Sequence, residues 1–384
     1  MEAYLDNSAT TKCAKEAVDL MVKIMEEDYG NPSSKHNYGF RAEQYVKEAR
    51  AIIAKALKCQ DKEIIFTSGG TESNNMAIIE GAIANQRRGK HVIVSSVEHS
   101  SVKEPFRYLT ELGFDVTYLP VDHAGVVSLE ELQKVLREDT ILVSTMMVNN
   151  EIGTIEPIEA MAKIIHSFCS DIIFHVDAIQ AFGKMRIIPK NMGIDMLSVS
   201  GHKIHGPKGS GFLYVRDKVK LKPLILGGGQ QKGMRSGTEN VPGVAGLGVA
   251  TRLIYENFEE KIEKMYALRE AFIAGILSME GTIVNGKRGH ESAPHIVSVS
   301  FKGLRSEVLL HALEERGIYV SSGSACSSNR PELSSTLQAI GIDRNLLDST
   351  LRFSFCFETT TEDLDYCLSV LQELLPTLRR YVRS

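Results

Sequence analysis

Short apolar runs alternate with stretches of helical periodicity through the first two thirds of the chain. The runs are rich in residues that favour strands, and turn residues bound them. Strands that alternate with helices predict an α/β fold with a mostly parallel, seven-stranded sheet in a large domain. The seven expected strands are Ile64 to Thr67, His91 to Ser95, Asp115 to Leu119, Ile141 to Met147, Ile172 to Asp177, Met196 to Ser200 and Gly211 to Val215.

Apolar residues at helical spacing precede the first strand and follow the last. We expect helices over Cys13 to Asp28 and Phe40 to Leu57, and a long helical stretch from about Val241 to Met279 that leads into a second domain. This smaller domain is expected to be α+β. Its strands would be Ile283 to Val284, His295 to Phe301, Ile318 to Val320 and Leu351 to Phe355, with helices near Ser306 to Arg316 and Thr361 to Leu378. The expected bounds are 15–256 for the large domain, and 1–14 with 257–384 for the small one.

Composition and charge narrow the class of partner. The chain has 384 residues, 43% of them apolar, which is enough for two cores. A net charge of −4, with both signs spread along the chain, gives no basic stripe for nucleic acid and no basic segment for a membrane surface. No apolar run reaches the roughly 18 residues of a membrane span, and the N-terminus lacks the pattern of a signal peptide. We therefore expect a cytoplasmic protein that acts on small molecules or proteins.

The cysteines lack the spacing of a metal site. None of the six forms a CxxC pair, so zinc is disfavoured, and the expected cytoplasmic location disfavours disulfides. Most are expected to be buried, inert thiols. They are Cys13, Cys59, Cys169, Cys326, Cys356 and Cys367.

Lys203 is the first candidate for chemistry. It lies between two histidines in a glycine-flanked turn after the strand that ends at Ser200. A partly desolvated lysine amine that faces a carbonyl can form a Schiff base, as with pyridoxal phosphate. The alternative is a surface loop in which Lys203 and Lys208 are solvated.

Asp177 closes a strongly apolar strand, where a carboxylate is costly unless a cation pairs with it. A protonated pyridine nitrogen would supply that cation, and Gln180 is expected one helical turn further on. The alternative is that Asp177 caps a helix.

Further polar clusters follow other strands, at the edge of the sheet where ligands bind. Residues 67–75 place two glycines before a helix that opens at about Thr71, a setting that suits a phosphate or an ordinary N-cap. His99 lies at a strand end, where it is either structural or catalytic. Asn150 could hydrogen-bond a ring oxygen or a substrate carboxylate, or tie a turn.

The smaller domain contributes two candidates. Cys326 lies in a segment of small polar residues without apolar periodicity, so we expect it to be exposed and favour a nucleophile over a tolerated surface thiol. Arg352, on an expected strand, is a candidate for bidentate binding of a carboxylate. The glycine-rich stretch 226–240 is expected to be either flexible or functional.

Taken in order, these segments resemble the pyridoxal-phosphate-dependent cysteine desulfurases of the NifS/IscS type, in the class-V branch of fold type I aminotransferases. The resemblance runs from the segment Tyr4-Leu-Asp-Asn-Ser-Ala-Thr-Thr to the C-terminal helix and includes some eight motifs in the family's order. It implies a cofactor, pyridoxal 5'-phosphate, and a substrate, L-cysteine. It also implies a homodimer and an acceptor protein for sulfur, either an iron–sulfur scaffold or a tRNA-thiolating enzyme.

The resemblance assigns a role to each candidate. Lys203 matches the Schiff-base lysine, Asp177 the partner of the ring nitrogen, Gln180 the partner of the ring hydroxyl, and His99 the imidazole stacked on the ring. Cys326 matches the cysteine that becomes a persulfide. The phosphate contacts would be Gly70, Thr71, Ser200, His202 and, from the other subunit, Thr238. The contacts to the substrate carboxylate would be Asn150 and Arg352.

One position departs from the family's pattern, since Cys356 stands where many members have glycine. This adds a second thiol that we expect near the substrate end of the site. Two other activities on the same cofactor stay open, a selenocysteine lyase and a transaminase, as does a sulfur carrier that has lost turnover.

Overall fold

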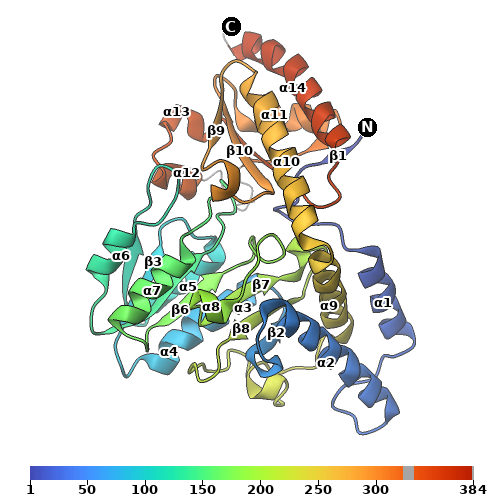
Figure 1. The fold of residues 1–384 in the computed structure, drawn as a ribbon, viewed down its shortest axis with the longest axis vertical. Helices are drawn as coiled ribbons and strands as arrows, with labels where there is room; N and C mark the ends of the chain where they lie inside the picture. Colours follow the sequence, from blue (N-terminus) through green and yellow to red (C-terminus); the bar gives the residue numbers. More distant parts are fainter. Residues whose placement is uncertain (323–332, 383–384) are drawn as a thin grey trace.

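The computed structural model describes residues 1–322 and 333–382 (Figure 1). Among these residues, the largest sheet has seven strands in the order β2-β8-β7-β6-β5-β3-β4, and all neighbours are parallel except that β8 runs antiparallel to β7 and β2. The strands are β2 (Ile64–Thr67), β3 (His91–Ser95), β4 (Asp115–Leu119), β5 (Thr140–Met146), β6 (Ile173–Asp177), β7 (Met196–Ser200) and β8 (Gly211–Val215). The α/β class is confirmed, and the seven strands agree with the expected runs to within one residue at each end.

Helices cover both faces of this sheet, because successive residues of a strand point to opposite sides. Ile64 and Phe66 belong to the core on one face, and Ile65 between them belongs to the core on the other. The first face carries α1 (Lys15–Glu26), α2 (Asn37–Leu57), α6 (Leu129–Val135), α7 (Ile158–Phe168) and α9 (Val241–Tyr255). The second carries α3 (Gly70–Asn75), the π-helix η2 (Met76–Glu80), α4 (Gly81–Asn85) and α5 (Ser100–Glu111).

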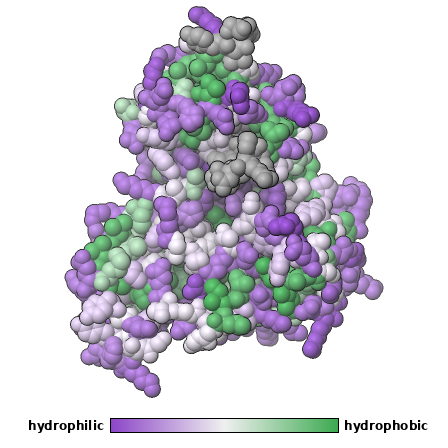
Figure 2. Space-filling view, turned by 180° about the vertical axis from the view of Figure 1, so that it is seen from behind, coloured by the Kyte–Doolittle hydropathy of each residue, from purple (hydrophilic) through white to green (hydrophobic). Residues whose placement is uncertain are grey.

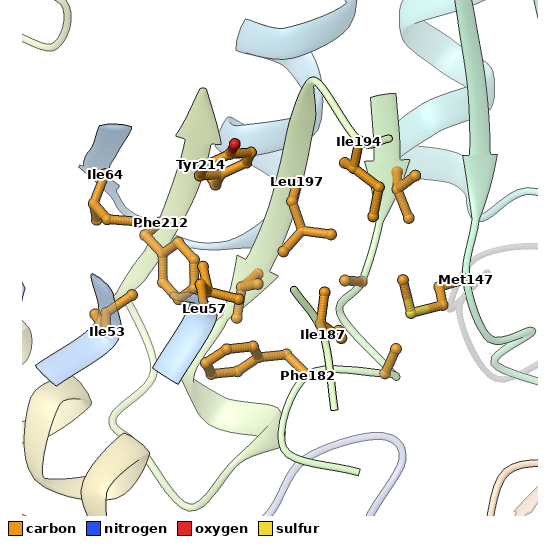
Figure 3. Close-up of a cluster of buried hydrophobic side chains, with 14 of the residues drawn as sticks. Ile53, Leu57, Ile64, Met147, Phe182, Ile187, Ile194, Leu197, Phe212 and Tyr214 are labelled. Carbon is orange, nitrogen blue, oxygen red and sulfur yellow. The ribbon is translucent and has the colours of Figure 1, made fainter. Parts of the chain in front are cut away.

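The first of these cores contains several fully buried aromatic side chains (Figure 3). Phe182 packs edge to face against Phe212, with ring centroids 5.3 Å apart, and Leu197 and Leu57 lie in the same cluster. Burial of each such side chain stabilises the fold by about 1.5–3 kcal/mol. This core fixes the ends of β6 and β7, where the candidate residues lie.

The helical stretch that leads to the second sheet is interrupted. It consists of α9 and α10 (Phe258–Leu277), and Asn257 between them adopts the left-handed conformation with a φ of 51°. In Figure 1, α10 runs from the lower body of the molecule into the upper one. The expected stretch from about Val241 to Met279 is therefore helical over most of its length, but it is two helices and not one.

The upper body contains a four-stranded antiparallel sheet in the order β12-β13-β10-β9, which packs on α10, α11 and α14. Its strands are β9 (Thr282–Asn285), β10 (Ile296–Phe301), β12 (Ser321–Ser322) and β13 (Thr350–Ser354), and its helices are α11 (Ser306–Glu314), α12 (Ser335–Ala339), α13 (Arg344–Leu347) and α14 (Thr361–Val382). The remaining short helices are η1 (Asp61–Glu63), α8 (Pro189–Met192), η3 (Gly201–Lys203), η4 (Gln231–Gly233) and η5 (Gly289–Glu291). This arrangement matches the expected α+β architecture.

The expected strand Ile318 to Val320 does not belong to this four-stranded sheet. As β11 (Ile318–Tyr319), it pairs in parallel with β1 (Ala3–Tyr4) at the N-terminus. The chain then crosses to the large sheet, where the Thr11 amide donates to the carbonyl oxygen of His202 over 2.9 Å. The N-terminal segment thus joins the two sheets and passes over the end of β7.

The surface in Figure 2 is mostly hydrophilic, with apolar areas on both the upper and lower parts of the molecule. Within residues 1–322 and 333–382, no helix is both long enough and apolar enough to cross a membrane.

Candidate active site

A cavity of about 400 Å³ lies at the carboxyl ends of β5, β6 and β7, where β12 and β13 of the second sheet meet the large sheet. This volume is within the range of small-molecule sites. The cavity brings together most of the residues singled out from the sequence, which are Gly70, Thr71, His99, Asn150, Asp177, Gln180, Ser200, His202, Lys203 and Arg352.

Lys203 ends the 3₁₀ turn that follows β7. Its Nζ donates hydrogen bonds to the main-chain carbonyl oxygens of Ser8 over 2.5 Å and of Ala9 over 2.7 Å. The side chain therefore points into the cavity toward the N-terminal segment. This contradicts the alternative in which Lys203 is a solvated residue of a surface loop.

Asp177 ends β6 and is 4% exposed. One carboxylate oxygen accepts from the Ile179 amide and the other from Nδ2 of Asn74, each over 2.9 Å. Burial raises the pKa of Asp177, whereas these donors and the nearby His99 and Lys203 lower it. Neither donor is charged, so the carboxylate suits a cationic ligand atom.

The segment after Asp177 forms a single turn and not a longer helix. The Phe182 amide donates to the Ala178 carbonyl oxygen over 2.8 Å, so Gln180 lies within one helical turn after Asp177, as expected. The Asp177 carboxylate accepts a hydrogen bond from the Ile179 amide, as a capping residue would. The alternative that Asp177 is a cap is therefore correct in part. Gln180 still lines the cavity, and its Nε2 donates to the Ser8 carbonyl oxygen over 3.0 Å.

His99 caps α5, and its Nδ1 accepts from the Ser101 amide over 3.1 Å. An Nδ1 that accepts a hydrogen bond carries no proton, so the neutral ring carries its proton on Nε2. Burial, as the largest cause, lowers the pKa of His99. The Ser101 hydroxyl also accepts from Asn74 Nδ2 over 2.9 Å, which connects His99 to Asp177.

Arg352 lies on β13 and reaches across from the second sheet. Its guanidinium donates to the Asn150 carbonyl oxygen over 2.8 Å and to the Asp6 carboxylate over 3.0 Å. Its Nε is buried and has no hydrogen-bond partner within the described parts of the chain. Arg352 lines the cavity, so its guanidinium is placed to bind a ligand carboxylate there.

Asn149 ties the turn next to Asn150. Its side chain donates to the Val97 carbonyl oxygen and accepts from the amides of Glu151 and Ile152. The residue that stabilises this turn is therefore Asn149, and not Asn150 as the sequence allowed. Asn150 lines the cavity.

Gly70, Ser200 and His202 line one side of the cavity. A Cβ on Gly70 would lie 2.1 Å from Cδ1 of Ile179, so a larger residue would fit only if the Ile179 side chain moved. Burial and the adjacent Lys203 lower the pKa of His202 to about 4, so the ring is neutral at physiological pH. Its Nδ1 lies 3.2 Å from Oγ1 of Thr10.

Thr238 and Cys356 do not line the cavity. Thr238 is exposed on the glycine-rich segment after β8. Cys326 lies outside the described residues. Cys356 is buried, 6% exposed, and is not among the lining residues, so this second thiol does not face the cavity. Its Sγ accepts from Oγ1 of Thr359 over 3.8 Å.

The other cysteines agree only in part with the expectation of buried thiols. Cys367 is buried, whereas Cys13, Cys59 and Cys169 are half-buried. Within the described ranges, no cluster of ligating side chains could hold a metal ion.

Five residues of the site were not singled out from the sequence. Asn74 and Ser101 connect Asp177 to His99, and Asp6, Ser8 and Ala9 contact Arg352, Gln180 and Lys203 from the N-terminal segment. The polar runs around residues 6–11 and 71–75 were the available signals. Neither run distinguishes a site residue from a turn or cap.

Two further carboxyl groups lie deep beside the site. Burial, as the largest cause, raises the pKa of Glu98 to about 8 and that of Glu156 to about 8. Each has one buried oxygen without a hydrogen-bond partner in the part of the chain that the structure describes. Both are therefore protonated at neutral pH.

These carboxyl groups predict a pH-dependent stability. Because their folded pKa is raised, their stabilising contribution is fully present below about pH 4.5 and is lost as the pH rises through about 8. The slope is up to about 1.4 kcal/mol per pH unit for each group. Urea unfolding between pH 5.5 and 8 should show a shallower slope in Glu156→Gln than in wild type. Glu130→Gln, at an exposed residue, is the control, and an unchanged slope in Glu156→Gln would contradict the assignment.

The site fits pyridoxal 5'-phosphate. The buried carboxylate of Asp177 suits a protonated ring nitrogen, and the neutral ring of His99 suits an aromatic face. Lys203 would supply an amine for covalent attachment of the cofactor. Together they define a site of the fold type I pyridoxal-phosphate enzymes.

Comparison with known proteins gives the same class. The family model of the class-V aminotransferases matches residues 3–367. A cysteine desulfurase IscS of Dictyoglomus turgidum is 45% identical over 379 residues, covering 98% of this chain and 95% of the relative. The chain therefore belongs to the class-V aminotransferase family, whose cofactor is pyridoxal phosphate, and within it to the cysteine desulfurases of the NifS/IscS type.

Solved structures agree. A NifS-like protein superposes with a TM-score of 0.93 at 39% identity, covering 98% of this chain and all of that one. A second, SspA in complex with cysteine, gives a TM-score of 0.80 at 36% identity, covering 92% of this chain and 98% of that one.

Proposed function

We propose that the protein is a pyridoxal-phosphate-dependent cysteine desulfurase, which converts L-cysteine to L-alanine and takes up the sulfur as a persulfide on Cys326. One observation carries the proposal: a single cavity brings together a lysine amine at Lys203, a buried carboxylate at Asp177 and an arginine guanidinium at Arg352. Relatives named as cysteine desulfurases and a structural neighbour solved with cysteine support it.

Each residue has a distinct task in this proposal. Lys203 would attach the cofactor and Asp177 would favour a protonated ring nitrogen. Gln180 would donate to the ring oxygen, and His99 would lie on the ring face. The phosphate would be held by Gly70, Thr71, Ser200 and His202, with Thr238 of a second subunit. Pyridoxal phosphate, when bound, withdraws electrons from the α-carbon of the amino acid.

The chain's own groups would move the proton and the sulfur. The Nζ of Lys203 is the base for the α-proton, and Nε2 of His99 is a second acid or base. The thiolate of Cys326 attacks the substrate sulfur, so an S–S bond forms while the C–S bond breaks. The carbon that loses sulfur takes up a proton, and alanine leaves. Cysteine and the Cys326 thiol thus become alanine and a persulfide without an external oxidant or reductant.

Purified protein tests the proposal directly. Supplied with pyridoxal phosphate it should show the cofactor's visible absorption, and with L-cysteine and a thiol reductant it should form alanine and sulfide. Turnover of selenocysteine but not cysteine would favour a selenocysteine lyase. Transfer of the amino group to a keto acid would favour a transaminase. A protein that never binds the cofactor would favour a carrier without turnover.

Arg352 provides a prediction about substrate binding. Lysine at this position keeps the charge but loses the planar fork that includes Nε. Loss of one or two hydrogen bonds to a carboxylate costs about 1.5–3 kcal/mol, so Arg352→Lys should raise KM for cysteine about 10- to 100-fold. Steady-state kinetics of alanine formation measures this. An unchanged KM would show that the carboxylate binds elsewhere, and Arg344→Lys, at an exposed helix residue, is the control.

We also propose a homodimer. Large apolar side chains are exposed along α1, the loop to α2 and the first turn of α2, which is the kind of patch that marks an interface. They are Val18, Val22, Met25, Tyr29, Tyr38 and Phe40. Thr238 is also exposed and outside its own cavity, as a residue that serves a second subunit would be. Light scattering of the purified protein tests the oligomeric state.

Three further statements stay predictions. The domain bounds 15–256, and 1–14 with 257–384, follow the change from one core to the other near α10. The acceptor of the persulfide would be an iron–sulfur scaffold or a tRNA-thiolating enzyme. The expected location is the cytoplasm.

A further inference from the structure

His295 lies just before β10, outside the residues that line the cavity, and is 2% exposed. Its Nε2 is 3.2 Å from Oε1 of Gln180. The strand that follows His295 belongs to the second sheet, whereas Gln180 belongs to the segment after β6. This contact therefore joins the second sheet to the wall of the cavity.

The neighbours of Gln180 fix which nitrogen of His295 carries the proton. The Ser8 carbonyl oxygen can only accept, so the amide atom of Gln180 that faces it is the NH₂ group. The other amide atom, which faces His295, is therefore the oxygen. Because this oxygen can only accept, Nε2 of His295 must be the N–H donor.

The surroundings of His295 favour the neutral ring. The charged groups that act on it are Lys184, Arg352, Arg269 and Lys203, all of which are cations, and burial acts in the same direction. Its Nδ1 is buried without a hydrogen-bond partner among residues 1–322 and 333–382. A proton there would be an unsatisfied buried donor beside four positive charges, so Nδ1 is unprotonated.

The amide of Gln180 is thereby held in one orientation. Its oxygen is occupied by His295, and one N–H is occupied by Ser8, so the second N–H is left for a ligand in the cavity. In the proposed enzyme, that ligand atom is the ring oxygen of pyridoxal phosphate. An N–H donor stabilises this oxygen in its anionic form, whereas the amide oxygen would repel it.

We propose that His295 is a positioning residue, which acts through Gln180 to keep an N–H donor aimed at the ring oxygen of the cofactor. The inference rests on the proposed function, because it requires the cofactor in this cavity. Without His295, only the Ser8 carbonyl oxygen still holds the Gln180 amide, so rotation costs less, and a rotated amide presents its oxygen to the cofactor. The pKa of the linkage between the cofactor and Lys203 should then rise.

Absorption against pH measures that effect in the cofactor-loaded protein. His295→Leu should raise the pH midpoint of the visible absorption change by about one unit, the size of a typical hydrogen-bond effect on a pKa. His295→Gln, whose side chain still offers an N–H donor, should restore most of the wild-type midpoint. Equal midpoints in wild type and His295→Leu would overturn the proposal, as would an equal shift in both variants.

A second measurement tests the contact without any activity. In full-length protein with ¹⁵N-labelled histidine, with and without pyridoxal phosphate, the His295 signals, identified by their loss in His295→Gln, should show a protonated Nε2 and an unprotonated Nδ1 from pH 6 to 9. The opposite tautomer, or a titration in this range, would overturn the inference. If wild type does not bind pyridoxal phosphate, the proposed function fails instead, and the cofactor-free spectrum still decides whether His295 donates to Gln180.

Discussion

Replacing Lys203 with alanine should remove both the visible absorption of the bound cofactor and the formation of alanine from cysteine. Nζ of Lys203 is held in the cavity by the carbonyl oxygens of Ser8 and Ala9, and its amine has two proposed tasks. It attaches the cofactor and accepts the α-proton. Loss of a positioned base alone lowers rates by about 10²–10⁴-fold, so turnover should fall by at least a hundredfold.

Lys208 provides the matched control. It lies in the same glycine-flanked segment but is exposed and does not line the cavity. Lys208→Ala should keep the absorption and the turnover of wild type. Circular dichroism should show that both variants are folded. A wild-type absorption spectrum in Lys203→Ala would contradict the attachment of the cofactor to this lysine.

Asp177→Asn should separate cofactor binding from catalysis. Asparagine keeps an oxygen for the donors at Ile179 or Asn74 but has no negative charge to favour a protonated ring nitrogen. We expect Lys203 to attach the cofactor still, while alanine formation falls by about 10²–10³-fold, as when a preorganised electrostatic group is removed. Single-turnover kinetics with saturating cysteine measures this loss.

The same substitution has a second expected effect, on stability. In the cofactor-free protein, the Asp177 carboxylate is buried, and desolvation raises its pKa. Asparagine removes this buried charge, so the cofactor-free variant should melt at or above the temperature of wild type. Asp217→Asn, at an exposed residue, is the control for the kinetics. Full turnover in Asp177→Asn would contradict the role of Asp177.

The sequence predicted the large sheet well because every strand except β4 is almost fully buried and consists mostly of apolar residues. The break at Asn257 was missed because apolar periodicity continues on both sides of it. The pairing of β1 with β11 was missed as well, since strands of two residues leave no periodic pattern. These two elements join residues more than 300 positions apart.

The site was predictable where side chains carry the chemistry. Lys203, Asp177 and His99 were found because their residue types are unusual at the ends of apolar strands. Ser8 and Ala9 were missed because they contribute main-chain carbonyl oxygens, which every residue has. His295 was missed because it lies at the start of an apolar strand, and only the tertiary contact with Gln180 reveals its position.

Mass spectrometry of the cofactor-loaded protein after brief exposure to L-cysteine tests the central claim most directly. We expect one extra sulfur atom on the peptide that contains Cys326, alanine in equal amount, and neither product in Lys203→Ala. Thiol reductant should remove the added sulfur. Alanine formed at the wild-type rate by Cys326→Ser, or sulfur found on another cysteine alone, would contradict it.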